Sequence, residues 1–312
     1  MCKKRKRTGI NKVMKVFCFG YGYVTQYLIK YLPANTQLVI TSRDIKKINI
    51  NANKNKLDNI LIINFADVNQ VQSELSSATT LLSTVPPSHE HNVIDPVLTQ
   101  YQTLIESSKH FDWMGYLSAT SVYGNQQGNW VDESTPPEPL SESGHLRLQA
   151  EQLWQQLDQP WHLFRITGIY GPGRSAFDRL KNNTARSFYK KDVVFNRIHI
   201  EDLIQLLLLS MQSPTPQQVY NIADQHPCPP HEVTQFAAQL LNMPEPKLES
   251  IDLNINTSNN KNKDITISKR LREFFSENKR VNANKILNLL NYQLHYPSYR
   301  DGLSAIIKNN DN

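Results

Sequence analysis

The stretch that most constrains the fold is an apolar run, residues 13–19, that leads directly into Gly20-Tyr21-Gly22. An apolar run that ends at a glycine is typical of a strand covered on both faces. Apolar residues then recur at helical spacing, namely at Val24, Tyr27, Leu28, Tyr31 and Leu32. This spacing predicts a helix with a single buried face. The sequence therefore predicts a strand, a tight glycine turn and a helix over residues 13–32.

The two glycines of this turn have different tasks. Gly20 permits the sharp change of direction, and Gly22 lacks the Cβ that would keep a pyrophosphate away from the helix N-terminus, where free N–H groups attract anions. On this pattern we assign Gly20, Gly22, Tyr23 and Val24 to a dinucleotide site. Thr25 stands where the dinucleotide fingerprint has a third glycine, so we expect looser helix–strand packing there. The alternative is that the glycines only make a tight connection.

Strand and helix patterns alternate along the chain that follows. The predicted strands are residues 37–41, 59–65, 80–85 and 113–118, with a long helix over 93–108. This alternation predicts an α/β fold with a doubly wound parallel sheet of the Rossmann type and helices on both faces. We expect a basic disordered tail over residues 1–12, a dinucleotide-binding domain over 13–167, and a smaller C-terminal substrate-binding part over 168–312 with a mobile loop near 249–268.

The end of the second strand decides which dinucleotide binds, because a carboxylate there accepts the ribose hydroxyls of NAD and a cation pairs with the 2′-phosphate of NADP. Ser42 occupies the place of the expected acid and is followed by Arg43, whose guanidinium suits a phosphate. The sequence thus favours NADP, and Asp44 keeps NAD open. Asp67, past the third strand, is placed either to meet an adenine amino group or to cap the next helix. Residues after the fourth strand are expected near the cofactor ribose: Thr84, Val85 and Pro86.

Charge and cysteine content narrow the classes of function. The net charge of +6 is accounted for by the lysines and arginines of residues 1–12, so the rest of the chain is neutral overall. We expect this segment to be a solvated extension; contact with nucleic acid or anionic lipid is the alternative and would depend on it alone. No apolar stretch reaches the roughly 18 residues of a membrane span. The 3 cysteines lie far apart, which fits a reducing compartment, and we expect a cytoplasmic protein that binds neither membranes nor nucleic acid.

Further segments carry a family resemblance. They are Ser118-Ala119-Thr120-Ser121-Val122-Tyr123-Gly124, Ser143-Gly144-His145-Leu146-Arg147, Arg165-Ile166-Thr167-Gly168-Ile169-Tyr170-Gly171-Pro172-Gly173, Arg197-Ile198-His199 and Tyr220-Asn221-Ile222-Ala223. In this order, and with the glycine turn, the chain resembles the extended short-chain dehydrogenase/reductase superfamily, most of all its atypical, NAD(P)-dependent epimerase/dehydratase-like branch of YeeZ-type proteins. The resemblance implies a nicotinamide dinucleotide cofactor. It also implies oxidoreductase, epimerase or dehydratase chemistry on a small carbonyl, alcohol or sugar-nucleotide substrate.

The positions that carry catalysis in that family differ here. Members with the usual activity have a Ser or Thr before the Val-Tyr-Gly segment and a Tyr-x-x-x-Lys at the start of the next helix; Ala119, Ser143 and Arg147 stand at these places. Arg147 could still hold the ribose hydroxyls, but it is always charged and cannot accept a proton. A serine hydroxyl is a poor acid or base without a strong neighbouring base. His145 would point roughly 200° around the helix from Ser143, away from that face.

The candidates for acting on the substrate are therefore hydroxyl groups near these positions and the arginine: Ser118, Thr120, Tyr123, Ser143 and Arg147. The alternative for the first three is that they end the strand and pack the loop. Loss of the usual catalytic side chains with retention of the glycine turn also fits a rival function, a catalytically silent NADP(H)-binding sensor or scaffold protein. By analogy with the family, residues 93–108 and 144–157 could pair in a homodimer.

The C-terminal part adds cations and metal-ligand residue types. Arginines that could bind an anionic substrate group, or be solvated or internally paired, are Arg174, Arg179 and Arg197. His226, Cys228 and His231 have ligand chemistry at short spacing. However, the intervening prolines stiffen this loop, and Pro229-Pro230 predicts a helix start, so we expect no metal site.

Overall fold

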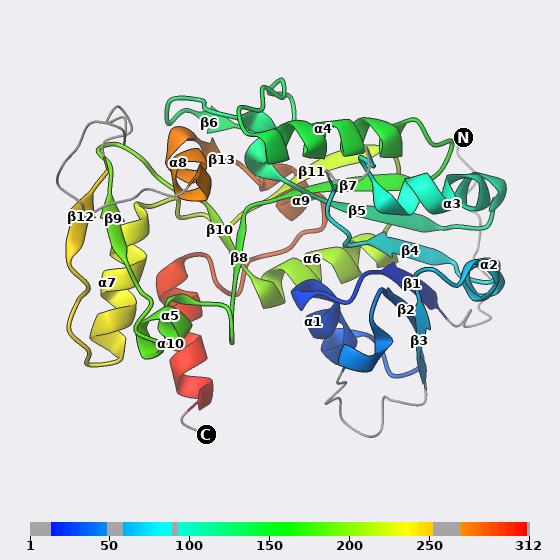
Figure 1. Ribbon diagram of the computed structural model, residues 1–312, viewed down its shortest axis with the longest axis horizontal. Coiled ribbons are helices and arrows are strands. Elements are labelled where there is room, and N and C mark those ends of the chain that lie inside the picture. The colour runs from blue at the N-terminus through cyan, green and yellow to red at the C-terminus, as the bar shows by residue number, and fades with distance from the viewer. Residues whose placement is uncertain (1–13, 49–58, 89–92, 252–268, 311–312) are drawn as a thin grey trace.

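The computed structural model describes residues 14–48, 59–88, 93–251 and 269–310 (Figure 1). Its centre is a parallel 7-stranded sheet in the order β11-β7-β5-β4-β1-β2-β3. The predicted doubly wound parallel sheet is confirmed. The strands are β1 (Lys15–Phe19), β2 (Gln37–Ser42), β3 (Ile60–Asn64), β4 (Thr80–Ser83), β5 (Trp113–Ala119), β7 (Trp161–Ile166) and β11 (Gln218–Ile222).

Helices cover both faces of the sheet, as its apolar strands require (Figure 1). On one face, Tyr101 and Trp154 are among the buried side chains that pack against the strands. On the other face, Leu28 and Leu207 do the same. The helices of the first face are α2 (Val68–Leu75), α3 (Pro96–Ser107) and α4 (Glu142–Gln155), and those of the second are α1 (Tyr23–Tyr31), α6 (Ile200–Gln212) and α9 (Asn284–Leu289).

The helix predicted over residues 93–108 begins only at Pro96, because Asp95 caps it. A carboxylate oxygen of Asp95 accepts the backbone N–H groups of Val97 and Leu98, both at 2.9 Å. Proline is favoured at the first helical position, where no intrahelical donor is needed. The indole of Trp154 on α4 donates to the other carboxylate oxygen at 2.8 Å, which ties the two helices together at this point.

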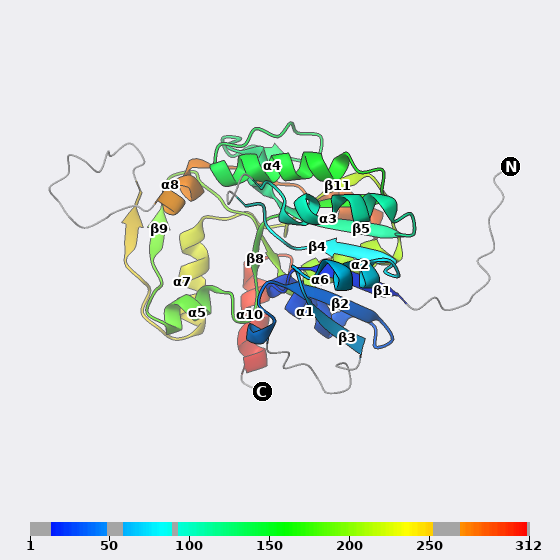
Figure 2. The same cartoon turned by 45° about the vertical axis from the view of Figure 1, so that its right-hand side comes forward.

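The chain after residue 167 builds a second group of elements beside the sheet. In Figures 1 and 2, α5, α7 and α10 gather away from β3, and they share a core of their own. Three members of this later chain return to the central sheet: α6 and α9 cover one face, and β11 pairs with β7 at the edge. The other elements are β6 (Trp130–Val131), β8 (Gly168–Tyr170), α5 (Ala176–Lys181), β9 (Ser187–Tyr189), β10 (Arg197–His199), α7 (Pro230–Leu240), β12 (Leu248–Ser250), α8 (Lys269–Ser276), β13 (Arg280–Val281) and α10 (Tyr299–Asn310), with short helical turns η1 (Ile45–Lys47) and η4 (Thr120–Tyr123).

Two sequence-based expectations fall largely outside the described ranges. The basic tail over residues 1–12 lies outside them entirely, and so does most of the loop expected near 249–268. Glu249 and Ser250, at the start of that expected loop, belong to β12. Within the described ranges, no helix combines the length and the apolar character that crossing a bilayer demands.

Candidate functional site

A large cavity opens at the carboxyl end of β1 and β4, where the order of strands reverses direction. In a doubly wound sheet this is the point at which ligands bind. The cavity has a volume of about 790 Å³. It is lined by seven of the residues that the sequence assigned to the cofactor: Gly20, Gly22, Ser42, Arg43, Thr84, Val85 and Pro86.

Gly20 makes the turn after β1 at a position that suits only glycine. Its φ is +99°, and an added Cβ would lie 2.6 Å from Oγ1 of Thr84. Thr84 is held in this place because its backbone N–H and its hydroxyl both donate to the carbonyl of Phe19, at 2.9 and 3.0 Å. The end of β4 therefore lies against the turn and forms the adjoining wall of the cavity.

Gly22 precedes α1 and leaves the N-terminus of that helix open. No side chain caps the helix there, and its first turn carries no acidic residue. An added Cβ on Gly22 would meet no atom within 4 Å, so the space in front of the helix is free. Unsatisfied N–H groups and the helix dipole make such an end a site for an anion such as a pyrophosphate.

Thr25 replaces the third glycine of the fingerprint without leaving a gap. Its side chain is fully buried. Its hydroxyl donates to the carbonyl of Gly20 at 2.8 Å and lies 3.4 Å from Sγ of Cys18. Burial raises the pKa of the Cys18 thiol to about 12, so this cysteine is a packed apolar residue and not a nucleophile. The looser packing expected at this turn is therefore not what the structure shows.

The end of β2 presents a cation to the cavity. The Ser42 side chain makes two hydrogen bonds to the backbone of Asp44. Its hydroxyl accepts the N–H of Asp44 and donates to the carbonyl of Asp44, both at 3.2 Å. Arg43 is exposed, and none of the ion pairs among the described residues involves it. Its guanidinium is thus available for a phosphate group.

Four further cofactor assignments lie elsewhere than the lining of this cavity: Tyr23, Val24, Asp67 and Arg147. Asp67 caps α2 by accepting the backbone N–H of Gln70 at 3.0 Å. Tyr23 donates its hydroxyl to the carbonyl of Pro172 at 3.0 Å, in the turn that follows β8. Val24 is packed in the core beneath the sheet. The sequence analysis in turn missed other lining residues, among them Tyr21, Gln26, Thr41 and Phe65.

Ser118 and Tyr123 are two candidates for acting on the substrate, and both hydroxyls make buried hydrogen bonds within the protein. The Ser118 hydroxyl donates to the carboxylate of Glu151 at 2.5 Å, and Glu151 forms an ion pair with Arg165 at 2.8 Å. Tyr123 donates its hydroxyl to Asn221 at 2.8 Å, and the Arg165 guanidinium lies 4.9 Å from its ring centroid. Burial raises the pKa of Tyr123, so it stays protonated.

The remaining candidates lie at the carboxyl end of β5 and along α4. Thr120 is half-buried at the start of η4, and His145 is exposed. Arg147 donates from Nη1 to the carbonyl of Leu117 at 2.9 Å, which places it against the end of β5. Ser143 is exposed, and its Oγ lies 3.3 Å from Oγ of Ser141.

The cations of the C-terminal part are separated into two places. The guanidinium of Arg174 lies 5.4 Å from the ring centroid of Tyr23, close to the glycine turn. Arg197 donates to the carbonyl of Phe195 at 3.0 Å and to Sγ of Cys228 at 3.2 Å. Burial and the charge of Arg197 lower the pKa of Arg179. Among the described residues, no group of three or more His, Cys, Asp or Glu side chains is arranged to hold a metal ion.

The chain is similar to known proteins in sequence and in fold. No model of a known protein family matches the chain. Protein YeeZ of Escherichia coli (strain K12) is 31% identical over 157 residues, which is 49% of this chain and 56% of YeeZ, so the match spans only about half of either protein.

Several solved structures match over nearly the whole chain. A conserved protein of unknown function from Silicibacter pomeroyi DSS is 35% identical, with a TM-score of 0.84, over 95% of this chain and 99% of that one. The dTDP-glucose 4,6-dehydratase of Bacillus anthracis str. Ames, solved in complex with NAD, is 14% identical with a TM-score of 0.73 over 95% of this chain and 96% of the other, which shows a shared fold. The chain belongs to the same family as the Silicibacter pomeroyi protein, and over about half of its length it is similar to the YeeZ-type proteins.

Proposed function

We propose that the protein binds NADP(H) in the cavity at β1 and β4 and acts as an oxidoreductase, epimerase or dehydratase on a small carbonyl, alcohol or sugar-nucleotide substrate. The observation that carries this proposal is the open N-terminus of α1 at a cavity that Arg43 also lines. The first feature suits the pyrophosphate, and the second suits a 2′-phosphate. NAD remains the alternative, since Asp44 also lines the cavity.

A bound nicotinamide dinucleotide would supply hydride transfer. The chain's own part is then to hold and orient the two reactants. Gly20 and Gly22 would leave room for the pyrophosphate, Thr84 and Val85 would border the ribose, and Arg147 stands in the place of the family's ribose-binding lysine.

The test is calorimetric titration of the full chain with NADP⁺, NADPH, NAD⁺ and NADH. Arg43→Asp is expected to weaken NADPH binding at least about 10-fold, because hydrogen bonds between charged groups contribute roughly 1.5–3 kcal/mol, and to leave NADH binding nearly unchanged. Lys181→Asp on α5, which does not line the cavity, makes the same change of net charge and serves as the control. Failure of all four dinucleotides to bind would refute the proposal.

A second candidate function is a catalytically silent NADP(H) sensor or scaffold. It is favoured by the buried contacts of Ser118 and Tyr123, because both hydroxyls already have partners inside the fold. The two functions separate on turnover. In a screen of carbonyl compounds and sugar nucleotides, an enzyme should change the cofactor absorbance in a way that Arg147→Ala abolishes, whereas a sensor binds the cofactor without turnover.

A further inference from the structure

Ser143 stands where related enzymes have their catalytic tyrosine, and it would act as an acid or base only with a strong base nearby. Its Oγ lies 3.3 Å from Oγ of Ser141. Ser141 is the N-cap of α4 and accepts the backbone N–H of Gly144 at 3.1 Å. Two hydroxyls in contact therefore lie at the N-terminus of α4, and the outer one, on Ser143, is exposed.

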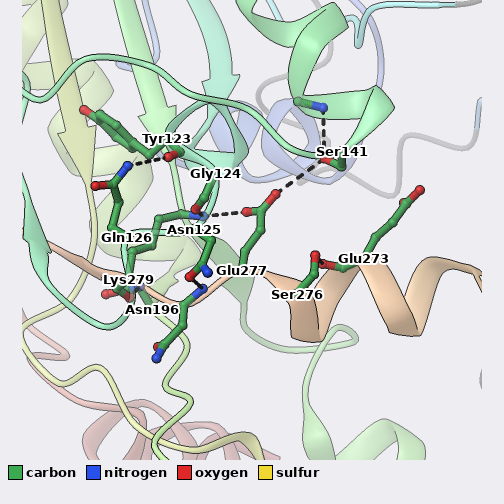
Figure 3. A network of polar contacts seen from close by, with 12 residues as sticks. Tyr123, Gly124, Asn125, Gln126, Ser141, Asn196, Glu273, Ser276, Glu277 and Lys279 are labelled. Carbon is green, nitrogen blue, oxygen red and sulfur yellow. Dashed lines mark hydrogen bonds and ion pairs between the residues drawn. The ribbon is translucent and has the colours of Figure 1, made fainter. Parts of the chain in front are cut away.

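A carboxylate from a distant part of the chain reaches these hydroxyls. Oε1 of Glu277 lies 3.5 Å from Oγ of Ser141 (Figure 3). Glu277 follows α8 and precedes β13, so the fold brings it to α4 across 136 residues of sequence. Its side chain is only 13% exposed. Hydrogen bonds of a proton-transfer site are commonly long in the absence of ligand and shorten when the reactants bind.

Lys279 compensates the charge of this carboxylate. Its Nζ lies 2.5 Å from Oε2 of Glu277 and donates to the carbonyl of Gly124 at 2.8 Å (Figure 3). The lysine side chain is 8% exposed. Burial lowers the pKa of Lys279, against the opposing effect of Glu277. The two oxygens of Glu277 thus have separate partners, Oε2 the ammonium and Oε1 the hydroxyl pair.

We propose that Glu277, acting through Ser141, is the base that gives Ser143 its proton-transfer ability. This inference rests on the proposed function. When an alcohol substrate loses its hydroxyl proton, that proton goes to Oγ of Ser143, the proton of Ser143 goes to Oγ of Ser141, and the proton of Ser141 goes to Oε1 of Glu277. Three O–H bonds break and three form, no electrons leave or enter these residues, and the reverse direction returns the proton. Ser143 is the group that touches the substrate, and Ser141, Glu277 and Lys279 act through it.

The test measures the reactivity of Ser143 without cofactor or substrate. Phenylmethylsulfonyl fluoride sulfonylates a serine whose proton a base removes: the Oγ–S bond forms, the S–F bond breaks, fluoride leaves and the proton goes to the base. Modification of Ser143 in the full chain is followed by peptide mass spectrometry. Glu277→Gln is expected to slow it about 100-fold, within the usual contribution of a general base. Glu273→Gln, a change of the same kind on α8, should leave the rate unchanged.

Variants of Ser141 distinguish the relay from a purely structural contact. Ser141→Asn keeps an N-cap of similar strength but removes the hydroxyl, whereas Ser141→Thr keeps both. We expect Ser141→Asn to slow labelling as Glu277→Gln does and Ser141→Thr to retain it, with all variants checked for folding by circular dichroism. No labelling of Ser143 in the wild type, or equal labelling in Glu277→Gln, would overturn the relay. Calorimetric titration with NADPH on the same samples shows separately whether the proposed function fails.

Discussion

Gly20 and Thr84 approach each other so closely that no side chain fits between them: a Cβ on Gly20 would lie 2.6 Å from Oγ1 of Thr84. Gly20→Ala is therefore expected to destabilise the protein by about 2 kcal/mol or more, since the positive φ adds roughly 1–2 kcal/mol of strain to the clash. Urea unfolding measures the loss, and calorimetry should show weaker dinucleotide binding.

Gly22→Ala is the matched experiment, because a Cβ there meets no atom of the protein. Its effect on the unfolding free energy should stay below about 1 kcal/mol, the usual scale of an N-cap change. Dinucleotide binding should nevertheless fall, because the methyl group would stand in front of the N-terminus of α1. Wild-type affinity in Gly22→Ala would show that the phosphates lie elsewhere.

Thr25→Gly completes the glycine fingerprint in the sequence but should destabilise the protein. The hydroxyl that bonds to the carbonyl of Gly20 is lost, at a cost of about 1 kcal/mol, and glycine is a poorer helix former than threonine by about 0.3 kcal/mol. Chemical denaturation should therefore show a loss of at least about 1 kcal/mol in the free energy of unfolding. Thr25→Ser, which keeps the hydroxyl, should lose less. A neutral or stabilising Thr25→Gly would contradict this account.

The buried pair of Glu151 and Arg165 should be among the most sensitive sites in the protein. Both side chains are almost fully buried, at 1% and 6% exposure. Glu151→Gln leaves the Arg165 guanidinium without its counter-charge, which typically costs 3–5 kcal/mol, roughly the stability of a weak domain. Thermal unfolding should show a large decrease in the melting temperature. The exposed pair of Lys109 and Asp158 is the control, and Asp158→Asn should leave the melting temperature unchanged.

Asp224 should make stability depend on pH. Its carboxyl is buried, one oxygen accepts the N–H of His226 at 3.1 Å, and the other has no partner. Burial raises its pKa to about 7 from an ordinary 3.8, although Arg197 opposes the shift and Asp202 and Asp301 add to it. The folded state binds this proton more tightly than the unfolded state. The contribution of Asp224 to the free energy of unfolding is therefore fully present below pH 3.8 and is lost as pH rises to about 7.

The check for Asp224 is the melting temperature of the wild type and of Asp224→Asn between pH 4 and pH 8. The variant cannot ionise at this position. Its melting temperature should therefore rise relative to that of the wild type as pH rises. Parallel curves for the two proteins would contradict the prediction.

Five of the seven strands of the central sheet were predictable because their signals are local, whereas β7 and β11 were not assigned as strands. Each of the five is a short apolar run, and the glycine turn at residues 20–22 fixes the first crossover, so that seven assigned cofactor residues line a single cavity. Helix boundaries were less predictable, since the start of α3 depends on how Asp95 is shared between the backbone and Trp154.

Side-chain directions and long-range contacts could not be predicted from the sequence. Ser118 and Tyr123 lie at the end of a strand, where a hydroxyl can point into the site or into the core, and only the buried partners Glu151 and Asn221 decide this. Glu277 and Lys279 lie in no recognisable pattern. They reach Ser141 and Gly124 only because β13 pairs with β6, which lies just past Gly124.

The return of α6 and β11 to the central sheet determines when that sheet can be completed during translation. A chain growing on the ribosome completes β7 at Ile166 but has not yet synthesised α6, which covers one face, or β11, which pairs with the edge of β7. Until residue 222 has emerged, that edge and that apolar face stay open to wrong partners. The central sheet is therefore completed late in translation, after β8, α5, β9 and β10 have been synthesised.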